Sequence, residues 1–127
     1  MNIGLGNKRR MVLVVGADPH ARAILRNALE GAGFSVGEAA DGQEGERTTL
    51  RIRPDAILAD LALETIDSSG AITAKLKDSH IPVYIVSNAA DALVGTVALH
   101  DLGISGVFLK PVDPAVVVQT LKLQLAA

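Results

Sequence analysis

The sequence contains no cysteine and no tryptophan, and only three of its 127 residues are aromatic. Without cysteine the chain can form no disulfide bond, no thiolate metal site and no cysteine nucleophile. The aromatic residues are Phe34, Tyr84 and Phe108, too few for the stacked platform with which many proteins bind single-stranded nucleic acid. The core must therefore be built mainly from Val, Leu, Ile and Ala.

The chain also lacks a large excess of charge of either sign, and it lacks long apolar runs. Twelve Lys and Arg against fourteen Asp and Glu give a net charge of −2 at pH 7, so no overall field favours nucleic acid or an anionic membrane. No apolar run approaches the ~20 residues of a membrane span, and residues 1–10 lack the apolar stretch of a signal peptide. We therefore expect a cytoplasmic protein that contacts neither DNA nor membrane directly.

Apolar residues, by contrast, are plentiful. They make up 49% of a chain whose length is close to the commonest size of one domain. The basic cluster Lys8-Arg9-Arg10 is short and precedes the first apolar run, which is typical of a solvated segment. We expect residues 1–10 to form an N-terminal leader and residues 11–127 to form a single domain.

Strand-like apolar runs alternate with helix-like segments along the whole chain. The predicted strands are Met11–Val15, Phe34–Glu38, Ala56–Ala59, Val83–Val86 and Gly106–Leu109. The predicted helices cover about 19–31, 43–52, 71–77, 91–102 and 114–125, and Asp18-Pro19 and Asp113-Pro114 are strong helix starts. Five strand–helix units with right-handed crossovers predict an α/β fold: a doubly wound five-stranded parallel sheet with helices on both faces.

Reactive side chains follow the ends of three predicted strands. Asp60 follows the third strand, Ser87 the fourth and Lys110 the fifth. In a doubly wound sheet the functional crevice lies beyond the carboxyl ends of the strands, so we expect these side chains to converge. A carboxylate that faces a lysine can act as a nucleophile toward phosphorus, while the hydroxyl and the ammonium hold phosphoryl oxygens.

Three motifs in this order resemble the receiver domain of bacterial response regulators, over Met11 to about Leu123. They are PDAILAD (54–60), IPVYIVS (81–87) and GVFLKP (106–111). The resemblance implies a flavodoxin-like fold and a role in two-component or phosphorelay signalling rather than as an enzyme. It implies that Asp60 is the phosphoacceptor, Ser87 the switch hydroxyl and Lys110 the contact to the phosphoryl group.

The same resemblance implies further features. The Lys110–Pro111 peptide bond is expected to be cis, as it usually is in the family. The implied partner is a histidine kinase or a phosphotransfer protein, and the last two helices with the fifth strand are an expected surface for a homodimer.

The chain departs from the family pattern where the first predicted strand ends. Two adjacent acids hold a magnesium ion there in the family, whereas this sequence has Gly16 and Ala17. The remaining candidate ligands are Asp60, the backbone carbonyl of Ala62 and Asp18, although we interpret Asp18 as a helix cap. Because Asp60 and Lys110 together are close to neutral, we expect magnesium binding to be weak or absent.

A second departure keeps another hypothesis open. Val107 stands three residues before the lysine, where the family commonly has an aromatic ring, and strand alternation predicts that Phe108 faces the core instead. The alternative is a pseudo-receiver that serves as a protein–protein interaction or dimerisation module without phosphorylation. A small enzyme or ligand-binding domain of the same fold is disfavoured, because no Gly-rich phosphate loop opens a helix.

Overall fold

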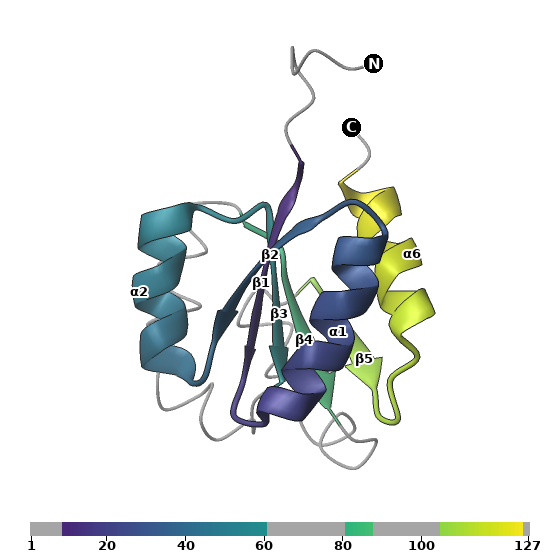
Figure 1. Cartoon of the computed structure of the whole chain (residues 1–127), viewed down its shortest axis with the longest axis horizontal. Coiled ribbons are helices and arrows are strands. Elements are labelled where there is room, and N and C mark those ends of the chain that lie inside the picture. The colour runs from purple at the N-terminus through teal and green to yellow at the C-terminus, as the bar shows by residue number, and fades with distance from the viewer. Residues whose placement is uncertain (1–8, 61–80, 88–104, 126–127) are drawn as a thin grey trace.

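Figure 1 shows a computed structural model of the chain, in which residues 9–60, 81–87 and 105–125 are described. The strands are β1 (Met11–Gly16), β2 (Ser35–Ala39), β3 (Ala56–Asp60), β4 (Val83–Ser87) and β5 (Gly106–Leu109). They form one sheet in the order β2-β1-β3-β4-β5, and every neighbouring pair is parallel. The helices are α1 (Pro19–Gly31), α2 (Gly42–Ile52) and α6 (Pro114–Gln124).

Both faces of the sheet are covered, which confirms the predicted doubly wound fold. Helices α1 and α6 lie on one face and α2 lies on the other (Figure 1). On the first face Val14 and Leu58 pack with Leu29 and Leu121 of the helices, and all four side chains are almost completely buried. Each such burial is worth roughly 1.5–3 kcal/mol, so the apolar strands supply most of the stability. The predicted helices over 71–77 and 91–102 lie outside the described residues.

The helix caps that the sequence predicts are present. The Oδ1 atom of Asp18 accepts the N–H of His20 at 2.9 Å, and that of Asp113 accepts the N–H of Ala115 at 2.9 Å. Strand β2 begins one residue later than predicted, because the N–H of Phe34 donates to the carbonyl of Leu29 at 3.0 Å and continues the turn that ends α1. Within the described ranges, no helix combines the length and apolar character needed to cross a membrane.

A network of charged side chains ties α1 to the first two strands. Arg22 Nε donates to Glu38 Oε1 at 3.0 Å, and Arg26 Nη1 donates to Glu38 Oε2 at 2.8 Å. Arg22 also donates through Nη1 to the carbonyl oxygen of Gly16, the last residue of β1. The hydrogen bond from Arg22 lowers the pKa of the Glu38 carboxyl, and the contribution of Arg26 acts in the same direction, whereas burial opposes them.

This lowered pKa gives the stability of the domain a defined pH dependence. The contribution of Glu38 is fully present above the pKa of an unfolded Glu, about 4.3, and is lost as the pH falls through the lower folded value. We expect Glu38→Gln to lower the free energy of unfolding at pH 7 and to change it much less at pH 2 to 3. Urea unfolding at both pH values measures this, and an equal loss at both would contradict the assignment.

Candidate functional site

The candidate site lies at the carboxyl ends of the central strands. The register of β1 and β3 places Gly16 beside Asp60, and the register of β4 and β5 places Ser87 beside Leu109. The N–H of Lys110 then donates to the carbonyl oxygen of Ser87 at 2.8 Å, which fixes the start of the β5–α6 loop. Residues far apart in the sequence therefore meet at one edge of the sheet.

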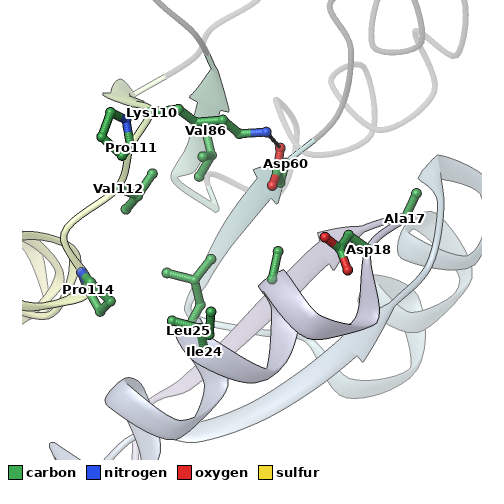
Figure 2. Close-up of a pocket in the computed structure, with 11 residues that line it drawn as sticks. Ala17, Asp18, Ile24, Leu25, Asp60, Val86, Lys110, Pro111, Val112 and Pro114 are labelled. Carbon is green, nitrogen blue, oxygen red and sulfur yellow. Dashed lines mark ion pairs between the residues drawn. The ribbon is translucent and has the colours of Figure 1, made fainter.

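An ion pair between Asp60 and Lys110 stands at the centre of this edge (Figure 2). The Nζ atom of Lys110 lies 2.8 Å from Oδ1 of Asp60, and the two side chains are 48% and 18% exposed. The Asp60 side chain is thus mostly shielded from solvent, whereas about half of the Lys110 side chain is exposed. The peptide bond from Lys110 to Pro111 is cis, as the family resemblance implied.

Ser87 closes strand β4 next to this pair. Its side chain is almost fully buried, at 5% exposure, whereas Asp60 is partly open to solvent. Strands β3 and β4 are direct neighbours in the sheet, with Ala59 opposite Ile85. The three side chains singled out from the sequence, Asp60, Ser87 and Lys110, therefore come from three adjacent segments of one edge.

At the end of β1, neither Gly16 nor Ala17 offers a carboxylate to a metal ion. A Cβ atom placed on Gly16 would lie 3.3 Å from both the Cβ and the carbonyl oxygen of Asp60, so β1 and β3 approach closely at this point. Ala17 contributes only a methyl group, and the carboxylate of Asp18 caps the N–H of His20 at 2.9 Å.

Asp60 and Asp18, the described residues among the ligands predicted for magnesium, are each engaged in another contact. Asp60 is paired with Lys110, Asp18 serves as a helix cap, and Ala62 lies outside the described residues. In the described part of the chain, no group of three His, Asp or Glu side chains could hold a metal ion. The residues present therefore do not fit the magnesium site that the family fold implies.

A cavity of about 490 Å³ opens beside the ion pair, between α1 and the β5–α6 loop (Figure 2). Its walls are mostly apolar, with Ile24 and Leu25 from α1, Val86 from β4 and Val112 from the loop. Asp60 and Lys110 lie at one end of it. The arrangement can accept a group that has one charged end and an apolar body.

Two residues near the site were missed by the sequence analysis. Arg22 binds the carbonyl oxygen of Gly16, and Glu38 holds Arg22 in that position. A signal was present, since Glu38 is the one charged residue of β2 and lies at the carboxyl end of that strand. Glu38 lies within β2 rather than beyond its end, so the rule that functional groups follow the strand ends does not point to it.

The side chains of β5 alternate as predicted. Val107 is 36% exposed, whereas the ring of Phe108 packs against the core and lies 5.7 Å from the ring of Tyr84. The side chain exposed at position 107 is therefore a small aliphatic one, and the neighbouring ring of Phe108 packs against the core.

Comparison with known proteins gives a consistent result. The family model of the response regulator receiver domain matches residues 12–122. The transcriptional regulatory protein PrrA of Mycobacterium leprae is 33% identical over 126 residues, which are 98% of this chain and 53% of that protein. The DNA-binding response regulator MtrA of Mycolicibacterium smegmatis is 26% identical over 92% of this chain and 51% of its own length. The chain thus spans about half the length of these curated relatives.

Solved structures share the fold. A CheY-like receiver domain protein from Methanospirillum hungatei JF-1 superposes with a TM-score of 0.82 at 22% identity, covering 94% of this chain and 95% of that one. The chemotaxis response regulator CheY4 of Vibrio cholerae gives a TM-score of 0.79 at 23% identity, with 91% and 98% covered. Together with the match of the family model, these similarities show that the chain belongs to the response regulator receiver domain family.

Proposed function

We propose that Asp60 is the phosphoacceptor of this receiver domain and that it takes a phosphoryl group from a cytoplasmic histidine kinase or phosphotransfer protein. The observation that carries this proposal is the 2.8 Å contact between Asp60 and Lys110 at the carboxyl edge of the sheet. A carboxylate held there by a partly exposed ammonium is accessible to a donor, and its own position is fixed. We propose that the chain acts as a signalling module and performs no catalytic turnover of its own.

The proposed transfer needs one bond to form and one to break. A carboxylate oxygen of Asp60 bonds to phosphorus, while the phosphorus–nitrogen bond of the donor phosphohistidine breaks and its electron pair stays on the imidazole nitrogen. The ammonium of Lys110 has three N–H donors, so it can turn from Asp60 toward the new phosphoryl oxygens. We assign the hydroxyl of Ser87 as the second donor to those oxygens.

A second candidate function follows from the β1 side of the site. Gly16 and Ala17 provide no metal ligand, so the charge that arrives with a phosphoryl group is offset mainly by Lys110. In a phosphorylation-independent pseudo-receiver, the same ion pair would act as a permanent link between β3 and the β5–α6 loop. Partners would then recognise the fold alone, and with a net charge of −2 we expect them to be proteins rather than DNA.

Acetyl phosphate separates the two functions. We expect intact-mass measurement to show an adduct of one phosphate on the native chain and none on Asp60→Asn, while Lys110→Gln slows its formation by roughly 100-fold because a donor to the phosphoryl oxygens is lost. Asp41→Asn is the matched control, since Asp41 caps α2 and Asn caps a helix equally well. A folded native chain that forms no adduct would contradict the phosphoacceptor role and leave the pseudo-receiver.

The metal site is tested separately by titration calorimetry. We expect no magnesium binding at concentrations below roughly 1 mM, because Asp60 is paired with Lys110 and neither Gly16 nor Ala17 adds a carboxylate beside it. Ala17→Asp should strengthen binding by adding a carboxylate to the same cavity, whereas Ala17→Asn, of equal size, should not. Sub-millimolar binding by the native chain that is lost in Asp60→Asn would show the expectation to be wrong.

We further propose that a second copy of the chain docks on β5 and α6. Leu109, Val116 and Leu123 are 53%, 52% and 70% exposed, and the last two lie seven residues apart on one face of α6. The helix predicted over 91–102, which completes this surface in the prediction, lies outside the described residues.

Light scattering after size exclusion measures this association. Leu123→Glu should shift the chain toward the monomer, because it places a charge in the proposed interface. Leu50→Glu is the control, since Leu50 is 60% exposed on α2, on the other face of the sheet. A native chain that stays monomeric at high concentration, or an equal effect of both variants, would exclude this interface.

A further inference from the structure

A second hollow lies at the opposite end of the sheet from Asp60. It has a volume of about 430 Å³, and its lining includes Arg9, Arg10, Phe34, Lys122 and Leu125, which we call the basic hollow. The carbonyl oxygen of Arg10 accepts the N–H of Ser35 at 2.9 Å, so the segment before β1 is fixed beside the start of β2. In Figure 1 the start of β1 and the end of α6 lie at the same end of the molecule.

Among the described residues that line the basic hollow, all the charged ones are positive. Arg9, Arg10 and Lys122 are exposed, and no acidic residue is among those that line it. Arg10 forms an ion pair with Asp55, with 3.9 Å between Nη1 and Oδ1, and both side chains are exposed to solvent. Arg9 and Lys122 form no ion pair with another described residue. A short basic segment and a helix distant in sequence thus bring like charges together.

The ends of two helices account for part of this arrangement. The C-cap residues Ala32 of α1 and Leu125 of α6 both line the hollow, and the carbonyl end of each helix carries roughly half a negative charge. The two ends together offset about one positive charge, and Asp55 lies 3.9 Å from Arg10, so the three cations exceed these negative charges by about one. Positive charge therefore stays in excess, and the mutual repulsion of the cations is relieved when an anion lies between them.

We propose that the basic hollow binds a small anion that carries a pyrophosphate group, such as a nucleoside polyphosphate. The forked guanidinium groups of Arg9 and Arg10 match phosphate oxygens, and Lys122 supplies a point charge from the opposite wall. The volume lies within the roughly 300–1,000 Å³ of small-molecule sites. Leu125 gives one wall an apolar surface for the body of the ligand. This site is separate from Asp60 and does not depend on the proposed phosphorylation.

The test is a titration with sodium pyrophosphate at constant ionic strength, followed by amide chemical shifts. We expect shifts at Gly33, Phe34 and Leu125 and none specific to the Asp60 edge, and binding should weaken as salt is raised. Combining Arg9→Gln with Lys122→Gln should weaken binding by at least about tenfold, because charge-assisted hydrogen bonds to phosphate are lost. Asp60→Asn should bind as the native chain does.

Arg51→Gln is the matched control, since Arg51 is exposed on α2 and lies outside the hollow. It removes one positive charge, as Lys122→Gln alone does, but should leave the affinity unchanged, whereas Lys122→Gln should weaken it. Thermal unfolding verifies that each variant is folded. Equal losses in Lys122→Gln and Arg51→Gln, or no shifts at the hollow at millimolar pyrophosphate, would overturn the proposal.

A second arm compares pyrophosphate with a nucleoside triphosphate. Tighter binding of the nucleotide identifies the apolar wall as part of the site, and equal binding identifies the phosphates as the whole determinant. Either result supports recognition of pyrophosphate. Preferential binding of duplex DNA at the same salt concentration would show instead that the hollow is part of an extended nucleic-acid surface, and would overturn a small-anion site.

Discussion

The ion pair between Asp60 and Lys110 depends on the parallel register of the central strands. Gly16 opposite Asp60, and the hydrogen bond from the N–H of Lys110 to the carbonyl of Ser87, place the two charged groups 2.8 Å apart. The strand register and the Lys110–Ser87 hydrogen bond are made by the backbone, so they do not depend on which side chains stand at the rim. The same frame is therefore present although Gly16, which ends β1, and Ala17, which follows it, stand where the family resemblance leads us to expect two acids.

The charge balance at this edge follows directly from those two residues. Where no acid adjoins a carboxylate, no divalent cation is needed to relieve repulsion, and at the end of β1 neither Gly16 nor Ala17 supplies such an acid, while Lys110 lies at hydrogen-bonding distance from Asp60. Gly16, where β1 approaches β3 closely, and Ala17, with only a methyl group, add no charge of their own beside Asp60. The site thus pairs a carboxylate with a lysine but has Gly16 and Ala17 where the family resemblance leads us to expect two acids, and for this reason we propose both phosphoryl transfer and simple docking as functions.

The sequence predicted the backbone well because its signals are local. Buried strands read as continuous apolar runs, and Asp-Pro pairs marked two helix starts that the structure confirms. The doubly wound parallel sheet and the convergence at the carboxyl edge then followed from general rules for such folds, whereas the strand order comes from the structure. The roles of Asp60, Ser87 and Lys110 remain proposals, since proximity alone does not establish them.

Contacts between side chains of distant segments could not be predicted in the same way. The link from Arg22 to Glu38 joins a helix to an edge strand, and neither residue stands in a motif of the sequence. Arg9 and Lys122 line the same hollow because the sheet begins where α6 ends, which the basic cluster before the first strand does not reveal by itself. Such arrangements depend on the packing of whole elements, and no short stretch of sequence encodes them.

The most direct test of the central ion pair is a crystal structure of the chain grown with MnCl₂ and examined by anomalous scattering, since manganese binds as magnesium does and is readily located. We predict the Lys110–Asp60 contact with no anomalous peak beside it. A manganese ion bonded to Asp60, with the carboxylate of Asp18 turned from the helix cap to complete its coordination, would contradict the neutral site described above.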